Sequence, residues 1–367
     1  MPLVDYARTR RPILDIDLDA APSDRWHEVG RRQRTRLGRF LRDIEAMVHD
    51  VVDQNLPEAP RWVPGVLKTA TATILRPLTI GLGRVTGKLA TTIARAFGED
   101  YTDEIRGLAR GSGIPESKLF LANLIYDFNV GYEGFRGACS SYSTTIAGKP
   151  ALFRNMDWDK PESTGRHTVM TRFHKGGGHY VGIAPLGCIG ILSAMRPGAW
   201  AVTINQAPAN GRPRLTQWPT MHRIRSACDA SLTFPMLVRR ISEYQTMTAF
   251  FAHVVGVEPR QQVVVESYAD SFHQRRAATG RPLVQANHFV SSFGRHLNPS
   301  DEIDDEGNYW DTYERHDAIV RRLRGVRPRS LREGLAVMAR SPVTHSATMN
   351  QMALCPATSE AIIKVRT

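Results

Sequence analysis

The sequence changes its pattern at the segment Gly131–Gly134. Before this point, the stretches Trp26–Val52 and Tyr101–Val130 carry apolar residues at helical spacing, and Gly111–Pro115 divides the second stretch. After it, short runs of β-branched and aromatic residues alternate with turn residues, which is typical of strands. A helical first part followed by a strand-rich part predicts an α+β protein.

The strand-rich part has a predicted order of elements. We expect strands at Val169–Phe173, Tyr180–Ala184, Cys188–Leu192, Ala199–Asn205 and Gln262–Ser267. A helical block, Leu215–Val254, is expected between the last two of these strands. The chain shows no internal repeat or low-complexity tract, and its 367 residues suffice for one large domain or two.

A predicted β-hairpin opens the strand-rich part. Its strands are expected at Ser141–Ile146 and Ala151–Arg154, joined by a tight turn at Ala147–Pro150. Cys139 stands before the first strand of this hairpin, and Arg154 and Asp157 stand at the end of the second strand. Such a hairpin brings a thiol close to a guanidinium group and a carboxylate.

The cysteine needs help before it can act as a nucleophile. A free thiol has a pKa of roughly 8.5, and only the thiolate attacks. Arg154 can supply the positive charge that favours the thiolate. If the bond before Cys139 is cut, the exposed α-amino group, with an ordinary pKa of about 8, becomes a base on the nucleophile itself.

The motif C-x(14)-R-N-M-D, from Cys139 through Arg154 to Asp157, resembles the start of the mature chain in one family of N-terminal-nucleophile (Ntn) hydrolases. This family includes choloylglycine hydrolase, acid ceramidase and N-acylethanolamine acid amidase. Further similar blocks follow the family's order: Leu18–Trp26, Tyr101–Gly107, Leu119–Tyr126, Val284–His288 and Tyr313–Ile319. Blocks that match in order over most of the chain are specific, whereas one alone would be weak.

The resemblance implies a fold and a division of the chain. The family fold is an αββα four-layer sandwich, here preceded by a helical N-terminal segment. Residues 1–138 then correspond to a leader, like a propeptide or α-subunit, and residues 139–367 to the catalytic domain, like a β-subunit. The two halves are expected to be able to stay associated after cleavage.

The resemblance also implies roles for six residues. Cys139 is the expected nucleophile, freed by cleavage of Ala138–Cys139, and Asn205 and Asn287 match positions that hold the oxyanion. The remaining three matches are Arg154 and Asp157, the charged pair beside the nucleophile, and Arg315, which is implicated in buttressing the site or in self-cleavage. Asp157 is expected to anchor the freed amino terminus, and Arg154 to hold negative charge near the thiolate.

One departure from the family pattern stands beside Asn205. The acid amidase and ceramidase branch ends this strand in Asp-Glu, whereas this chain has Asn205-Gln206, which is closer to the bile-acid and penicillin acylase branch. A different reading uses histidine: His288 follows Asn287, and His167, His174 and His179 follow the hairpin, so a Cys–His hydrolase of the uncut chain stays open.

These residues predict a self-processing cysteine amidohydrolase that cleaves a linear N-acyl amide, of the fatty-acid amide, ceramide or N-acylethanolamine type, through a thioester acyl-enzyme. Acyl transfer, or a bile-salt or penicillin type of acylase, uses the same intermediate and stays open. A non-catalytic lipid-binding homologue is an alternative from another class. Neither a cofactor nor a metal is expected, since no His, Cys or carboxylate cluster has the spacing of ligands.

The net charge of +12 raises the question of anionic partners. Segment 61–97 contains no acidic residue and reads as two basic amphipathic helices separated at Pro77. These helices suit peripheral contact with an anionic membrane surface, and packing on the enzyme body is an equal alternative. Without a nucleic-acid-binding motif, we expect no nucleic-acid partner.

Cysteine usage and hydropathy bear on the compartment. The chain has four cysteines, Cys139, Cys188, Cys228 and Cys355, and a reactive Cys139 leaves an odd number, which argues against a disulfide framework. No signal peptide or long apolar span is evident. A cytoplasmic or peripheral membrane location is therefore expected.

Overall fold

The computed structural model describes residues 3–55, 95–131, 137–158, 165–207, 214–268, 271–278, 280–298 and 311–366. The two basic helices expected within 61–97, with their break at Pro77, lie outside these residues except for the last three positions. No helix in the described ranges is long and apolar enough to cross a membrane.

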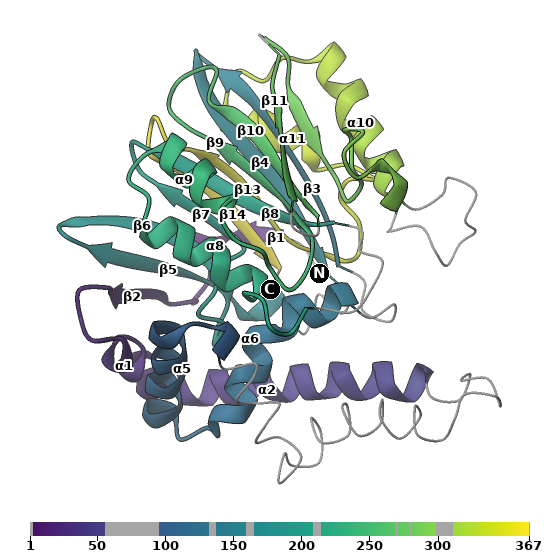
Figure 1. Cartoon of the computed structure of the whole chain (residues 1–367). Coiled ribbons are helices and arrows are strands. Elements are labelled where there is room, and N and C mark those ends of the chain that lie inside the picture. Colours follow the sequence, from purple (N-terminus) through teal and green to yellow (C-terminus); the bar gives the residue numbers. More distant parts are fainter. Residues whose placement is uncertain are drawn as a thin grey trace.

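Two β-sheets form the centre of the described structure (Figure 1). The 6-stranded sheet has the order β1-β14-β13-β4-β3-β12, with bounds Leu3–Asp5, Glu360–Arg366, Thr348–Cys355, Lys149–Trp158, Gly137–Ile146 and Leu283–Gln285. The 8-stranded sheet has the order β11-β10-β9-β8-β7-β6-β5-β2, with bounds Ser271–Arg276, Gln262–Tyr268, Phe250–Val255, Trp200–Gln206, Ser193–Arg196, Gly178–Pro185, Thr168–Lys175 and Ile13–Asp17.

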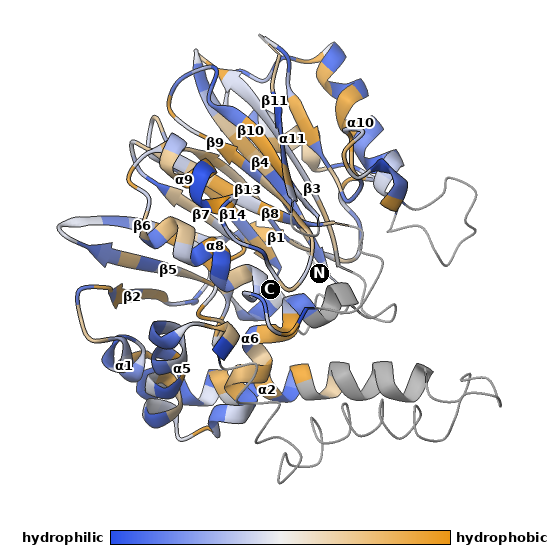
Figure 2. Cartoon of the chain, in the orientation of Figure 1, coloured by the Kyte–Doolittle hydropathy of each residue, from blue (hydrophilic) through white to orange (hydrophobic). Residues whose placement is uncertain are grey.

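The sheets stack face to face and helices cover their outer faces. Helices α10 (Thr312–Gly325) and α11 (Leu331–Met338) pack on the 6-stranded sheet, and α8 (Thr220–Asp229) and α9 (Phe234–Ile241) lie over the 8-stranded sheet. Buried apolar side chains of both sheets meet between them, among them Leu152, Val255 and Met352. Figure 2 shows this apolar character along the central strands. The expected αββα sandwich is therefore confirmed.

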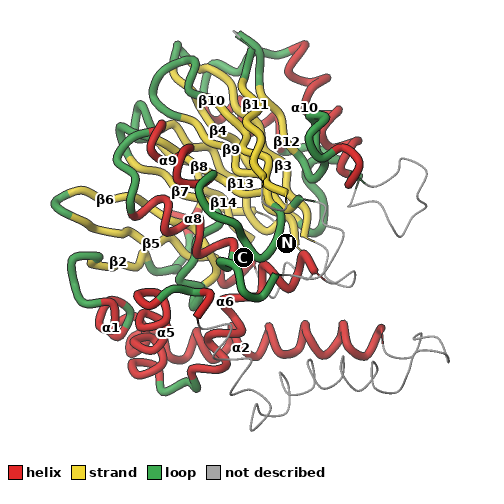
Figure 3. Tube along the Cα trace, in the orientation of Figure 1, coloured by secondary structure: helices red, strands yellow, loops and turns green. Residues whose placement is uncertain are grey.

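Residues 1–138, the expected leader, are largely helical where the structure describes them. They contain α1 (Pro22–Arg25), α2 (His27–Asn55), α5 (Glu99–Ser112) and α6 (Glu116–Gly131), which gather at one end of the molecule (Figure 3). Helices α2 and α5 approach closely because glycine faces the crossing: a Cβ on Gly111 would lie 2.0 Å from the carbonyl oxygen of His27. Helix α5 ends with Gly113 in the left-handed conformation, close to the predicted break.

The leader also contributes two strands that the sequence did not reveal. Strand β1 pairs antiparallel with β14, at the edge of the 6-stranded sheet. Strand β2 pairs parallel with β5, at the edge of the 8-stranded sheet. Hydrogen bonds therefore tie the leader into both sheets of the body.

Two predicted elements in the body are wrong. Cys188–Leu192 is not a strand: the backbone N–H of Ile189 donates to the side chain of Asn123 at 2.8 Å, away from any strand ladder. The predicted helical block Leu215–Val254 holds α8 and α9 but ends in strand β9. All six residues of β9 are buried, and a short, fully apolar run does not distinguish a strand from a helix by periodicity.

The predicted hairpin is present as β3 and β4, and it is longer than expected. A tight turn joins the strands, with Ala147 and Gly148 at φ of 49° and 77°. Strand β3 begins at Gly137 and β4 runs to Trp158, so Cys139 and Asp157 both lie within strands. In the register, Cys139 is opposite Met156 and Ala138 is opposite Asp157.

Candidate active site

The alternation of side chains along β3 and β4 assigns the candidate residues to two faces of the sheet. Cys139 and Arg154 lie on the same face of the 6-stranded sheet, because successive residues of a strand point to opposite faces. That face meets the 8-stranded sheet, since Arg154 bonds to β7 and β8. Asp157 lies on the other face, which α10 and α11 cover. The site is therefore built around the end of the hairpin, with groups on both of its faces.

Arg154 lies directly against the candidate nucleophile. Its Nη2 is 3.2 Å from the Sγ of Cys139, and the same nitrogen donates to the carbonyl oxygen of Ile204 at 2.8 Å. Nη1 donates to Ser193 Oγ at 2.9 Å. These bonds to β7 and β8 fix the guanidinium group, which is 1% exposed. The positive charge of Arg154 is therefore fixed beside the sulfur of Cys139.

Two other cysteines have surroundings that oppose a thiolate. Burial raises the pKa of Cys188 to about 12, and burial also raises the pKa of Cys228 well above its ordinary value. All four cysteines are free and buried. Among them, Cys139 has the guanidinium group at its sulfur.

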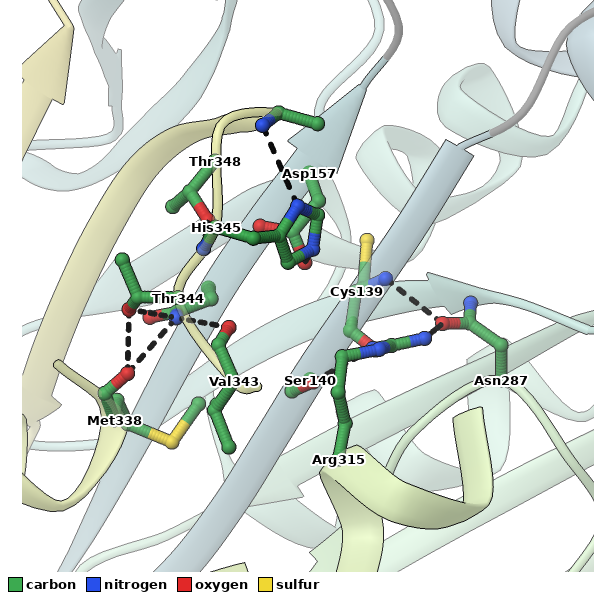
Figure 4. A network of polar contacts seen from close by, with 12 residues as sticks. Cys139, Ser140, Asp157, Asn287, Arg315, Met338, Val343, Thr344, His345 and Thr348 are labelled. Atoms are coloured by element: carbon green, nitrogen blue, oxygen red, sulfur yellow. Dashed lines mark hydrogen bonds and ion pairs between the residues drawn. The ribbon is translucent and has the colours of Figure 1, made fainter. Parts of the chain in front are cut away.

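Asn287 binds the backbone at the nucleophile. The N–H of Cys139 donates to Asn287 Oδ1 at 2.8 Å, and Arg315 Nη2 donates to the same oxygen at 2.9 Å (Figure 4). Asn287 Nδ2 donates to the carbonyl oxygen of Gln206 at 2.8 Å. In this geometry, Asn287 presents its oxygen to the nitrogen of the Ala138–Cys139 peptide bond.

Arg315 holds the strand on the carbonyl side of Cys139. From α10, its Nη1 donates to the carbonyl oxygen of Cys139 at 2.8 Å and to Ser140 Oγ at 2.7 Å. Burial lowers the pKa of Arg315, while the negative charges of Asp157 and Cys139 oppose that shift. Arg315 is therefore placed to stabilise negative charge at the hairpin end and to fix the backbone of the nucleophile.

Asn205 comes from the end of β8 and approaches the hairpin from the other sheet. Its Nδ2 donates to Ser141 Oγ at 3.2 Å and to the carbonyl oxygens of Gln285 and Ala286 at 3.1 and 3.2 Å. Its Oδ1 is buried and makes no hydrogen bond within the described part of the chain. Asn205 thus connects β8 with β3 and with the end of β12. It does so beside Ser141, which is the next residue after Cys139 on the same face of β3.

Asp157 is fully buried at the end of β4. Neither carboxylate oxygen makes a hydrogen bond within the described residues. Its Oδ2 lies 3.4 Å from Nε2 of His345, a residue in the loop that precedes β13. The six predicted residues thus converge on one hairpin end, with Arg154, Asn287 and Arg315 bonded to Cys139, and with Asn205 and Asp157 in the surrounding shell.

The histidines of the rival reading make no hydrogen bond or ion pair with Cys139 in the described structure. His288 Nδ1 contacts Thr312 Oγ1 at 3.0 Å, and burial lowers the pKa of His288 to about 3. His167 pairs with Asp43, and His174 pairs with Asp15. A ring with a pKa near 3 is a weak base at neutral pH.

Sequence reasoning missed three groups near the site. Tyr126 of α6 has a buried hydroxyl within electrostatic range of Cys139, and burial raises its pKa well above the ordinary value. His253 bridges Ser141 and Ser143 with bonds of 3.0 and 2.9 Å. His345 is the third. The block Leu119–Tyr126 signalled the first, whereas nothing local in the sequence marks the other two.

The four layers, with Cys139 near the start of strand β3, define the class of the fold: it is an Ntn-hydrolase fold. The solved structure of a Caenorhabditis elegans N-acylethanolamine-hydrolyzing acid amidase ortholog matches with a TM-score of 0.50 and 18% identity, over 60% of this chain and 93% of that chain. No family model matches the chain.

The curated relatives carry the same name. The N-acylethanolamine-hydrolyzing acid amidase of Caenorhabditis elegans is 24% identical over 301 residues, which are 78% of this chain and 75% of that protein. The Cavia porcellus protein of that name is 22% identical over 267 residues, which are 69% of this chain and 64% of that protein. The resemblance inferred from the sequence is confirmed, and the expected class, an amidohydrolase with the Ntn fold, agrees with these relatives.

Proposed function

We propose that this protein is a self-processing cysteine amidohydrolase of linear amides and that Cys139 is its nucleophile. The observation that carries the proposal is the contact of 3.2 Å between Arg154 Nη2 and Cys139 Sγ, together with the bond from the Cys139 N–H to Asn287. Arg154 contacts the sulfur that would attack, and Asn287 binds the nitrogen that would leave when the chain is cut.

Self-cleavage begins with attack of Cys139 Sγ on the carbonyl carbon of Ala138. A C–S bond forms, the C–N bond breaks, and the thiol proton ends on the nitrogen, which gives a thioester and a free α-amine. Water then hydrolyses the thioester and regenerates the thiol. Asn287 Oδ1 holds the leaving N–H, and Arg315 holds the carbonyl of Cys139, so the peptide plane stays fixed during attack.

The cleaved enzyme uses the same sulfur on an external amide. The α-amine of Cys139 takes the thiol proton and later gives it to the departing amine, while the acyl group stays on sulfur. Asn205 and Asn287 are the proposed donors to the oxyanion. This role requires both side-chain amides to exchange their present carbonyl partners for the substrate oxygen.

The substrate class follows from the relatives and the surroundings of sulfur. Both curated relatives are named for hydrolysis of N-acylethanolamines, which are linear fatty amides. Cys139 belongs to the main hydrophobic core cluster, together with Met156 and Tyr126, so the surroundings of its sulfur are apolar, which favours an apolar acyl chain. A fatty or otherwise apolar N-acyl amide is the proposed substrate; transfer of the acyl group to an amine acceptor would use the same thioester.

The leader, residues 1–138, is proposed to remain bound to residues 139–367 after the cut. Its strands β1 and β2 are hydrogen-bonded into the two sheets, and Glu104 of α5 forms a buried ion pair with Arg225 of α8. Breaking Ala138–Cys139 removes none of these contacts. The peripheral membrane contact proposed for segment 61–97 would then be carried by the bound leader.

The test is the intact mass of the purified wild-type protein and of Cys139→Ala, with Cys355→Ala as the control for loss of an unrelated thiol. We expect fragments that meet at Ala138–Cys139 in the wild type and the control, a single chain in Cys139→Ala, and hydrolysis of fatty amides only where cutting occurs. An uncut wild type with full amidase activity would contradict self-processing. An uncut, inactive protein that binds lipid would support the non-catalytic alternative.

A further inference from the structure

His345 contacts the buried carboxylate of the candidate site from an unexpected part of the chain. It lies in the loop between α11 and β13, and its Nε2 is 3.4 Å from Asp157 Oδ2 (Figure 4). The imidazole is 24% exposed, whereas Asp157 is fully buried. His345 therefore connects an enclosed carboxylate with the protein surface.

The backbone of this loop fixes the orientation of the imidazole. The N–H of Ala347 donates to His345 Nδ1 at 3.3 Å, so a neutral ring carries its proton on Nε2. The N–H of His345 donates to Thr348 Oγ1 at 3.1 Å, and Thr348 is the cross-strand partner of Asp157. Nε2 of the ring therefore lies on the side of the Asp157 carboxylate, at a distance of 3.4 Å that makes a close contact and not a hydrogen bond.

Asp157 needs such a partner because of its position. A buried carboxylate without hydrogen bonds is costly, and both oxygens of Asp157 are in that state among the described residues. Asp157 is also the cross-strand partner of Ala138, the residue that loses its peptide bond in the proposed self-cleavage. Among the described residues, Arg315 on α10 is a charged group close enough to interact electrostatically with Asp157.

We propose that His345 is a positioning residue for self-cleavage: through the contact of its Nε2 it keeps the Asp157 carboxylate beside the Ala138–Cys139 bond. The inference rests on the proposed function. Cleavage by water converts the amide into a carboxylate on Ala138 and an α-ammonium group on Cys139, so one negative and one positive charge appear at the hairpin end. Asp157 is then in place to bind that ammonium group, and His345 keeps its carboxylate from turning away before the charge exists.

The experiment compares His345→Ala with His345→Gln, since the glutamine amide offers an N–H near the position of Nε2 without a titrating ring. The matched control is His174→Ala, which removes a histidine from an exposed pair with Asp15 at 2.9 Å. Each variant is purified soon after synthesis, and the cut fraction is followed over time by intact mass. Urea unfolding of each variant in a Cys139→Ala background checks that the fold is kept.

We expect cutting to be slowed by about tenfold or more in His345→Ala, because a carboxylate that is free to turn is misplaced for its partner. His345→Gln should recover most of this loss, and His174→Ala should cut at the wild-type rate. In an Asp157→Asn background, His345→Ala should cause no further slowing, because the two residues act through one contact.

Two outcomes overturn the inference. If His345→Ala cuts as fast as the wild type, His345 does not position the carboxylate, although the wild type still self-processes. If His345→Gln is as slow as His345→Ala and both unfold at lower urea, the ring serves only packing. A wild type that never cuts is a separate result, since it removes the proposed self-processing together with the step that His345 would serve.

Discussion

Two buried polar clusters differ in how many of their carboxylate and amide oxygens accept a hydrogen bond. One lies at Glu104, between helices α1, α5 and α8, and the other lies at Cys139. In the first, Glu104 is fully buried and its oxygens accept from Arg25 Nη1 at 2.9 Å, from Trp26 Nε1 at 2.8 Å and from Arg225 Nη2 at 2.9 Å, with a further bond from Arg225 Nη1. Each of the two carboxylate oxygens of Glu104 thus accepts two hydrogen bonds. This carboxylate joins α1, α5 and α8.

The cluster at Cys139 leaves acceptors without donors. Asp157 has two such oxygens, and Asn205 has one, within the described residues. Native proteins satisfy most buried polar groups, so unsatisfied acceptors beside a candidate nucleophile call for an explanation. The difference suggests two roles: the Glu104 cluster stabilises the fold, whereas the hairpin end has acceptors that would be available to groups formed in the proposed reaction. Four predictions test this contrast.

The largest effect is expected at the satisfied cluster. Glu104→Ala removes the closer of the two carboxylates that contact buried Arg225 and leaves it with Asp229 at 3.4 Å, which should lower the free energy of unfolding by about 3 kcal/mol. Urea unfolding in the uncut Cys139→Ala background measures it. The control is Glu28→Ala, which removes an exposed pair with Arg31 and should change nothing measurable. Equal stability of the two variants would remove the contrast.

The second prediction concerns Asp127, a buried carboxylate of α6 that accepts from Thr220 Oγ1 at 2.6 Å and from Thr248 Oγ1 at 2.9 Å. Burial raises its pKa from 3.8 to about 6, although the threonine bonds oppose the shift. The folded pKa lies above the unfolded value, so this stabilising contribution is complete below pH 4 and is lost as the pH rises through 6.

In Asp127→Asn that loss should disappear. The difference in unfolding free energy between variant and wild type should change by about 3 kcal/mol between pH 4 and pH 7, with the variant gaining as the pH rises. Urea titrations of both proteins at several pH values measure this difference. Parallel stability curves would show that Asp127 does not titrate in this range.

The third prediction is that removing the charge of a different buried carboxylate, Asp157, does not lower the free energy of unfolding. Asp157→Asn removes a buried charge that has no hydrogen bond in the described structure, so the free energy of unfolding should stay the same or rise by about 1 kcal/mol. Self-cleavage should nevertheless be slowed by about tenfold or more, as intact mass followed over time would show. A loss of stability comparable to that of Glu104→Ala would mean that Asp157 is held as firmly as Glu104.

The fourth prediction uses Asn205, which has a satisfied donor and an unsatisfied acceptor. Asn205→Asp replaces the Nδ2 donor with an oxygen that faces the carbonyl oxygens of Gln285 and Ala286. Amide hydrolysis at pH 7 should fall by about a hundredfold and recover in part as the pH falls, because a protonated carboxyl donates again. Asn205→Ala should fall without recovering at any pH. A flat profile for Asn205→Asp would exclude a donor role at this position.

The sequence predicted the hairpin well, because its information is local. The turn residues Ala147 and Gly148 and the alternating strands specify one register, and that register places Arg154 at Cys139. The convergence of Asn205, Asn287 and Arg315 depends on contacts between elements distant in the chain. Without the family resemblance, no periodicity would have brought these three residues together.

Other features could not be predicted, for identifiable physical reasons. Strand β2 pairs in parallel with a strand far along the chain, so no turn marks the pairing. Strand β9 is buried on both faces and lacks alternation, which explains why it was assigned to a helix. His345 acts through a loop whose shape depends on backbone hydrogen bonds to Ala347 and Thr348, and residue type alone does not report such bonds.

The pairing of β1 with β14 places Leu3 opposite Arg366, so the two ends of the described chain lie side by side. A circularly permuted gene could therefore start at Cys139, pass from Arg366 through a short loop into Leu3, and end at Ala138. Its product would carry the α-amine of Cys139 once the initiating methionine is removed, with no peptide bond to cut. Such a chain would separate two things that the proposed self-processing joins: the assembly of the sandwich and the creation of its amino group.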